Sequence, residues 1–143
     1  MTQCQTVTSE LVVNFQTGID MKDITDPLEK AIRESGIRTG SANIFIAGST
    51  GSVTTIEYEP GVVKDLKRAV NTLAPPDMEY EHEKAWHDGN GHSHVQAALI
   101  GPSLTLPIRN FVPALGTWQQ VVAVNHDNRA RKRKVLLTFH GIS

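Results

Sequence analysis

The sequence is poor in cysteine, which limits both its redox chemistry and its means of cross-linking. Cys4 is the only cysteine among 143 residues, so no disulfide can form within the chain. A chain without disulfides suits a reducing compartment, and we expect the cytoplasm. The first residues, 1–5, also lack the basic and then apolar pattern of a signal peptide.

Charge imbalance and long apolar runs are missing as well. The formal net charge is -1, which gives no overall field to attract nucleic acid or an anionic membrane. No apolar stretch approaches the ~20 residues that a membrane-spanning helix needs. The one strongly basic run, 129–134, is short and has no interleaved aromatic residues, so we interpret it as a solvated hairpin. We therefore expect neither a nucleic acid nor a membrane as partner.

The pattern of apolar residues predicts an α+β fold in a single domain, 1–143, without repeats or linkers. Strand-like runs occur at 3–17, 43–47, 53–58, 103–108, 115–124 and 134–139. Helical runs occur after a cap at Asp23 or Asp26 up to Gly36, at 61–73 and at 95–100. The helices are too few for alternating βαβ units, so we predict a mainly antiparallel sheet. Its last two strands should pair around an Asp127–Asn128 turn.

The segment 86–94, with sequence WHDGNGHSH, concentrates three histidines and a carboxylate around two glycines. Imidazole and carboxylate are ordinary ligands for zinc and similar divalent ions. His92 and His94 share a face only if the segment is extended; if a helix has already begun at His92, they point apart. The alternative is a solvated loop whose histidines only titrate near neutral pH. Because 79–94 has little apolar content, we expect it to be largely loop, or exposed, or functional.

Two glycine-containing loops are candidate phosphate cradles. Gly89, Asn90 and Gly91 can present several backbone N–H groups just before a helix, whose N-terminus favours an anion. The loop that contains Ser49 and Thr50 adds two hydroxyl donors, although a plain flexible turn explains this loop better when it is taken by itself. Neither loop is a Walker motif, because the Gly-Lys-Ser/Thr ending is absent.

Three further residues are candidates from their side-chain chemistry. Glu57 ends a predicted strand and could bind a metal or act as a base; the alternative is an exposed edge carboxylate. Trp118 and Gln119 offer an aromatic ring and an amide that could stack on and hydrogen-bond a heterocycle. Core packing is the alternative interpretation of Trp118.

Three segments, 45–57, 88–107 and 115–120, come in the order of the YjbQ-like family of secondary thiamine-phosphate synthases and resemble its motifs. The resemblance spans nearly the whole chain, and 88–107 is its longest and most specific part. It implies a β-sandwich-like α+β domain that assembles as a homotrimer, with a site of histidines and acids near a subunit interface. The implied reaction joins a pyrimidine diphosphate to a thiazole phosphate and releases pyrophosphate.

Under this hypothesis each candidate has a role. The residues expected to be catalytic are His94, His92, Asp88 and Glu57. Those expected to hold substrate or phosphate are Ser49, Thr50, Gly89, Asn90, Gly91, Trp118 and Gln119. A divalent metal, zinc or magnesium, would bind His92, His94 and His87. Two other functions use the same residues: non-catalytic trimeric binding of a metal or phosphorylated metabolite, and metal-dependent hydrolysis.

The sequence departs from the family pattern at one position that matters for a metal. Gly48 stands where the family has a histidine, and Ile56 replaces an asparagine before Glu57. A metal site that relied on that histidine would lose a ligand. His87 or His82, from the histidine-rich segment, could supply the missing imidazole, and in that case replacing His87 should lower metal affinity.

Overall fold

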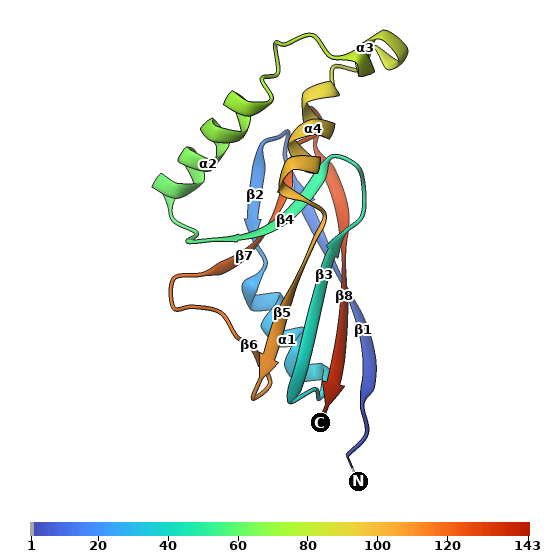
Figure 1. Ribbon diagram of the computed structural model, residues 1–143, viewed down its shortest axis with the longest axis vertical. Helices are drawn as coiled ribbons and strands as arrows, with labels where there is room; N and C mark the ends of the chain where they lie inside the picture. Colours follow the sequence, from blue (N-terminus) through green and yellow to red (C-terminus); the bar gives the residue numbers. More distant parts are fainter. Residues whose placement is uncertain (1) are drawn as a thin grey trace.

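The computed structural model describes residues 2–143, and this part of the chain forms eight strands and four helices (Figure 1). The strands are β1 (Gln5–Phe15), β2 (Asp20–Asp23), β3 (Thr39–Ile46), β4 (Gly51–Ile56), β5 (Ser103–Arg109), β6 (Val112–Pro113), β7 (Gln120–Asn125) and β8 (Arg131–Ile142). The helices are α1 (Thr25–Ser35), α2 (Pro60–Leu73), α3 (Glu81–Trp86) and α4 (Gly91–Ile100). None of them, within the residues described, is both long and apolar enough to cross a membrane.

The strands form two sheets with orders β1-β8-β3-β5-β6 and β2-β7-β4. Every pairing is antiparallel, which confirms the predicted α+β fold with antiparallel sheets. The longest pairing joins β1 to β8, and β8 also pairs with β3 along its other edge. The two ends of the chain thus lie in one sheet.

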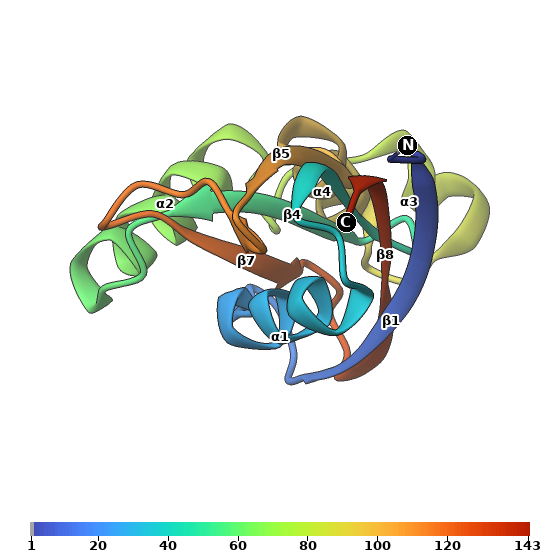
Figure 2. The same cartoon turned by 90° about the horizontal axis from the view of Figure 1, so that it is seen from below.

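The main core lies between the two sheets and α1. Side chains alternate along a strand, so β8 turns Leu137 and Phe139 inward, where they pack with Val121 of β7. Leu28 and Ile32 of α1 join this core and have no exposed surface. Figure 2 shows α1 enclosed between β7 and the curved β1–β8 pair.

The other face of the smaller sheet is covered by α2. Met21, Val122 and Val124 point to this face and pack with Val63 and Leu66 of α2. α4 lies beside β4 and α2, and α3 follows α2 at the end of the molecule that also holds the β3–β4 loop (Figure 1). This arrangement brings the start of α4 toward the β3–β4 loop, which contains Ser49 and Thr50.

The segment 79–94 is more helical than the sequence predicts. α3 occupies 81–86, and α4 begins at Gly91 rather than at Val95. α3 has no buried residue, so it lacks the apolar periodicity by which a helix is recognised in a sequence. The first turn of α4 is also without large apolar residues: it buries Gly91 and Ser93, and His94 lines a cavity.

The predicted hairpin around Asp127–Asn128 is wrong. A turn is present, but β7 pairs with β2 and β4, whereas β8 pairs with β1 and β3. The chain therefore crosses from one sheet to the other between His126 and Ala130. Asp127 is buried at this crossing and bonds to other segments, so it does more than close a turn between neighbouring strands.

The start of α1 decides between Asp23 and Asp26, the two caps that the sequence left open. The helix begins at Thr25, and Asp26 lies in its first turn. Asp23 is the residue that supports the start, since its Oδ1 accepts from the Thr25 backbone N–H at 2.9 Å and from the Thr25 hydroxyl at 2.6 Å. Gly36 ends the helix in the left-handed conformation, with φ 75°, as predicted.

Candidate functional site

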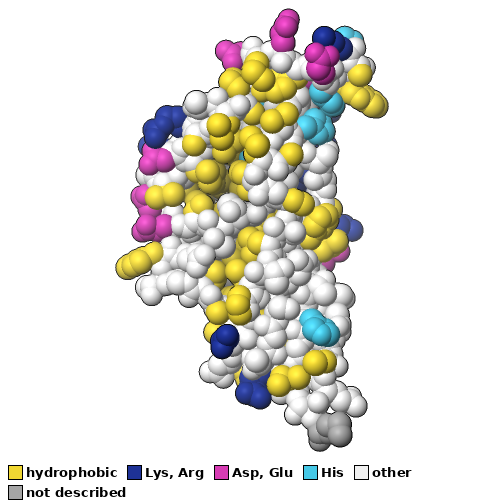
Figure 3. Space-filling model, in the orientation of Figure 1, with side chains coloured by type: hydrophobic (Ala, Val, Ile, Leu, Met, Phe, Trp, Pro, Cys, Tyr) yellow, Lys and Arg dark blue, Asp and Glu magenta, His cyan; other side chains and the backbone are white. Residues whose placement is uncertain are grey.

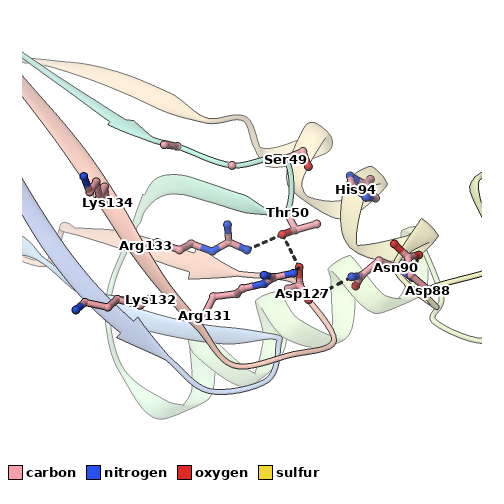
Figure 4. Close-up of a pocket in the computed structure, with 12 residues that line it drawn as sticks. Ser49, Thr50, Asp88, Asn90, His94, Asp127, Arg131, Lys132, Arg133 and Lys134 are labelled. Carbon is pink, nitrogen blue, oxygen red and sulfur yellow. Dashed lines mark hydrogen bonds and ion pairs between the residues drawn. The ribbon is translucent and has the colours of Figure 1, made fainter. Parts of the chain in front are cut away.

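A cavity of about 630 Å³ opens where the β3–β4 loop, the start of α4 and the β7–β8 crossing meet (Figure 4). Its lining residues are Ala47, Gly48, Ser49, Thr50, Asp88, Asn90, His94, Asp127, Arg131, Lys132, Arg133 and Lys134. Five of them were predicted from the sequence as site residues: Ser49, Thr50, Asp88, Asn90 and His94. The cavity joins residues that are up to 87 positions apart in the chain, from Ala47 to Lys134.

Asp127 forms the floor of the cavity and ties its segments together. It is 1% exposed, and its Oδ2 accepts from the Thr50 hydroxyl at 2.9 Å and lies 3.0 Å from Arg131 Nη2. Asn90 Nδ2 donates to its Oδ1 at 3.2 Å. Burial alone would raise the pKa of Asp127, but the bonds from Thr50, Arg131 and Asn90 outweigh it and lower the pKa. The carboxylate therefore stays charged.

Arg133 lies beside Asp127 and is only 7% exposed. Its Nη2 donates to Thr50 Oγ1 at 2.5 Å and to Asn125 Oδ1 at 2.7 Å. Thr50 thus accepts from Arg133 while its single hydrogen goes to Asp127, so the hydroxyl has no hydrogen left for a ligand. Burial lowers the pKa of Arg133, although a guanidinium remains charged in proteins.

The interpretation of the basic run as a solvated hairpin is wrong for Arg133. Alternation along β8 buries Arg133 on the same face as Val135 and Leu137, while Lys132 and Lys134 stay exposed. This period-two pattern was present in the sequence and could have identified Arg133 as an inward-facing cation. The run contributes a wall of positive charge to the cavity.

A pair of histidines from different helices meets at one side of the cavity. His82 of α3 places Nε2 3.0 Å from Asp88 Oδ1, and its ring centroid lies 4.5 Å from that of His94. The backbone N–H of Asn90 donates to the same Asp88 oxygen at 3.0 Å. This bond, and more weakly His82, lower the pKa of Asp88. His82 is therefore the histidine that joins His94, a partnership that depends on α3.

His92 and His87 lie elsewhere. Because α4 begins at Gly91, the side chains of His92 and His94 diverge, which decides between the two alternatives left open by the sequence. The His92 ring lies 6.5 Å from that of Tyr80, and burial lowers its pKa. His87 ends α3 and borders a separate hollow next to Met78. The structure thus does not bring His87, His92 and His94 together.

The loop at 89–91 forms an anion cradle, but the chain fills it with its own carboxylate. Glu83 Oε2 accepts from Gly89 N at 2.7 Å, and Glu83 Oε1 accepts from Gly91 N at 2.8 Å. Both bonds lower the pKa of Glu83, and the bond from Gly89 has the larger effect. In this conformation the amides of Gly89 and Gly91 hold α3 in place, and the predicted binding of a phosphate there stays a prediction.

Glu57, Trp118 and Gln119 lie at the far end of β4. The six residues of that strand, Gly51–Ile56, separate them from the cavity by about 20 Å. Trp118 is 72% exposed, so the interpretation as a core residue is wrong. Gln119 Nε2 donates to Thr55 Oγ1 at 3.1 Å, which fixes this second group beside the strand. Within one chain, these three residues are outside the cavity.

The donor atoms beside the cavity fit a divalent metal. One ligand atom each from His82, Glu83 and Asp88 lies within 4.8 Å of the others, and His94 stands next to His82. Two imidazoles with carboxylates match the ligand chemistry of zinc. His82, Glu83 and Asp88 are therefore the group whose ligand atoms lie close enough together to hold an ion, although Glu83 also bonds to two backbone amides. Of the three histidines predicted as ligands, His94 lies next to this group, whereas His87 and His92 do not.

One buried histidine was missed by the sequence analysis. His126 is 1% exposed, with Nε2 2.8 Å from Ser52 Oγ and Nδ1 3.0 Å from Gln96 Oε1. The amide nitrogen of Gln96 donates to Asn71, so the amide oxygen of Gln96 accepts from the Nδ1–H of His126. The Nε2 of His126 then carries no hydrogen and accepts from the Ser52 hydroxyl. Burial, aided by the charge of Arg133, lowers the pKa of His126 to about 4. His126 is thus a neutral structural residue behind the cavity.

Comparison with known proteins identifies the family of this chain. The family described as "UPF0047 protein YjbQ-like" matches residues 9–142. A UPF0047 protein from Methanothermobacter thermautotrophicus is 31% identical over 134 residues, which cover 94% of this chain and 92% of that protein.

Solved structures agree with this match. A YbjQ-like protein of unknown function from Sulfolobus solfataricus has a TM-score of 0.92 at 27% identity. The match covers 97% of this chain and 99% of that protein's chain. A YjbQ/UPF0047 protein from Clostridium acetobutylicum has a TM-score of 0.83 at 31% identity, and the match covers 92% of this chain and 98% of that protein's chain. The chain therefore belongs to the YjbQ-like UPF0047 family.

Proposed function

We propose that the protein is a transferase of the thiamine-phosphate synthase type, which joins a pyrimidine diphosphate to a thiazole phosphate and releases pyrophosphate. The observation that supports this is a cavity with a hydrogen-bonded acid–imidazole pair, His82–Asp88, on one side and a basic wall on another. The lining contains four cations, at 131–134, against two carboxylates, Asp88 and Asp127. We place the reaction in the cytoplasm, where a lone cysteine stays reduced.

The chemistry needs positioning and charge neutralisation more than a covalent intermediate. The bond between the pyrimidine methylene carbon and the diphosphate oxygen breaks, and both electrons leave with pyrophosphate. The lone pair of the thiazole nitrogen forms the new C–N bond, and the positive charge stays on the resulting thiazolium. A protein accelerates such a step by holding the two rings in line and by neutralising the leaving group.

The residues at the cavity suit these tasks. The Ser49 hydroxyl and the side chains of Arg131 and Lys132 are available to the leaving diphosphate, while Thr50 positions Asp127 and Arg133 beneath them. His82, Glu83 and Asp88, with His94 beside them, would hold a divalent ion, zinc or magnesium, which when bound supplies further positive charge to the diphosphate. His92 faces Tyr80 and has no role in this proposal.

The proposal includes assembly as a homotrimer. Glu57, Trp118 and Gln119 lie outside the cavity of their own chain, so a neighbouring copy would have to bring them to a shared site. In support, Leu99 on α4 is 60% exposed and Trp118 72% exposed, and Figure 3 shows apolar side chains gathered over the half of the molecule that holds α2 and α4. Exposed apolar surface of this kind commonly marks an interface.

The test is an assay of thiamine phosphate formation from the two substrates, with matched histidine variants. We expect turnover by the unmodified protein, its loss in His94→Ala, and its retention in His140→Ala, an exposed histidine that contacts Thr6 in the larger sheet. Both variants should keep the parent melting temperature. Full turnover in His94→Ala would contradict the assignment of His94.

The same assay separates the competing functions. Binding of both substrates without turnover would indicate a non-catalytic protein that binds phosphorylated metabolites. Conversion of the diphosphate to free phosphate, with no thiamine phosphate, would indicate a metal-dependent hydrolase.

A further inference from the structure

The guanidinium of Arg133 fills the space that a side chain at Gly48 would need. Gly48 has φ +113°, in the left-handed region, and a Cβ added to it would lie 2.5 Å from Arg133 Nη1. A carbon and a nitrogen that are not bonded do not approach so closely. A side chain at position 48 and the guanidinium in its present place therefore exclude each other. Position 48 is also where the sequence departs from the family's histidine.

The Nη1 edge of Arg133 is free to meet a ligand. Nε and Nη2 are engaged by Asn125 and Thr50, whereas Nη1 has no acceptor among residues 2–143. Every fully buried side-chain nitrogen or oxygen in that range has a partner, so Nη1 must reach the cavity that Gly48 also lines. In Figure 4 one amino group of Arg133 reaches Thr50 and the other points away from it.

We propose that this Nη1 edge, uncovered by the absence of a side chain at Gly48, is a subsite for one phosphoryl group. The guanidinium is already fixed by Thr50 and Asn125, so little side-chain freedom is lost when an anion binds. A hydrogen bond between a charged donor and a charged acceptor is short and strong, and burial strengthens it. The inference rests on the proposed function only for the identity of the natural ligand.

The charge of the lining favours a phosphoryl group over a carboxylate. Arg131 is paired with Asp127, and Asp88 with His82. Arg133 remains as a positive charge without an ion-pair partner among the described residues. The lining as a whole has four cations against two carboxylates, and this surplus matches a phosphoryl group with two negative charges better than a carboxylate with one.

The experiment is a calorimetric titration with inorganic pyrophosphate of the unmodified protein, Gly48→Ala and Gly101→Ala. Gly101 is the matched control, because its φ is +100° and a Cβ there meets nothing within 4 Å. Both substitutions impose similar backbone strain, and only Gly48→Ala crowds Arg133. We expect Gly48→Ala to weaken pyrophosphate binding about tenfold or more and Gly101→Ala to change it by less than about twofold.

A second measurement needs no glycine variant and covers the case in which Gly48→Ala fails to fold. Guanidinium NMR signals of the unmodified protein, with Arg133 assigned by its loss in Arg133→Lys, should shift when pyrophosphate is added. Equal affinity in both glycine variants, unshifted Arg133 signals at saturation, or no pyrophosphate binding at all would overturn the subsite.

Failure of the subsite and failure of the proposed function give different results. Pyrophosphate binding that depends on Gly48, together with no transferase turnover, upholds the subsite and overturns the function. Full turnover and full pyrophosphate affinity in Gly48→Ala overturn the subsite and leave the function standing.

Discussion

His82 Nε2 lies 3.0 Å from Asp88 Oδ1, so α3 and the turn before α4 contribute a hydrogen-bonded pair next to the His94 ring. From sequence alone, the imidazole that compensates for Gly48 could be His82 or His87. Of these two, His82 lies beside His94, whereas His87 borders a different hollow.

Zinc binding should therefore depend on His82 and not on His87. We expect His82→Ala to lower zinc affinity about tenfold or more, because one of the three side chains that would bind the ion is lost. His87→Ala, at the residue that follows the same helix, should bind zinc as the parent does. Zinc titration against a chromophoric chelator checks both variants. Equal loss in the two, or no loss in His82→Ala, would contradict the ligand set.

The Thr50 hydroxyl should matter for stability because it links two buried charged groups. Thr50→Val keeps the shape of the side chain but removes the bonds to Asp127 and Arg133. We expect the free energy of unfolding to fall by about 1–3 kcal/mol. Thr50→Ser keeps the hydroxyl and should lose clearly less. Urea unfolding of the three proteins measures this, and equal stability of Val and Ser variants would refute the link.

His126 should make the stability depend on acid pH. Its pKa is about 4 in the folded protein and 6.5 when unperturbed, so between these values the unfolded chain binds more protons. Its contribution is fully present above pH 6.5 and is lost as the pH falls toward 4, by about 3 kcal/mol in all. Denaturant unfolding followed from pH 7.5 down to pH 4 should show this loss.

Matched histidine variants isolate that effect. His126→Asn cannot titrate in this range, so its stability should fall less steeply with acid than that of the parent. His140→Asn, at an exposed position, should keep the parent's slope. If His126→Asn retained the full slope, another group would have to be responsible.

Glu83 should act as the latch that holds α3 against α4. Glu83→Ala removes the acceptor for the amides of Gly89 and Gly91, so both amides should exchange hydrogen with solvent faster. Glu81→Ala is the matched control, because among residues 2–143 the carboxylate of Glu81 pairs with Lys84 on its own helix and not with the amides of 89–91. Hydrogen exchange resolved at these glycines tests the idea, and similar exchange in the two variants would count against a latch.

Much of the site could be predicted because its residues are close in sequence. Asp88, Asn90 and His94 lie within one short motif, so their proximity needs no knowledge of the fold. Their partners come from distant segments. Arg133 turns inward because β8 lies between β1 and β3, a pairing hidden by the apparent β7–β8 hairpin. His82 reaches the site through α3, a helix without an apolar stripe.

The strands were easier to predict than their partners for a related reason. Apolar patterns predicted the positions of β3, β5, β7 and β8, by alternation in β5 and by a continuous apolar run in β3. Pairing depends on contacts between segments far apart, such as β1 with β8, about which local pattern carries no information.

The most direct test of the proposed function is the stoichiometry of products in one reaction mixture. Purified protein is incubated with a pyrimidine diphosphate, a thiazole phosphate and either zinc or magnesium, and thiamine phosphate and pyrophosphate are quantified together. The account predicts that both appear in equal amounts and that both disappear in His94→Ala. Substrates recovered unchanged, or free phosphate released without thiamine phosphate, would contradict it.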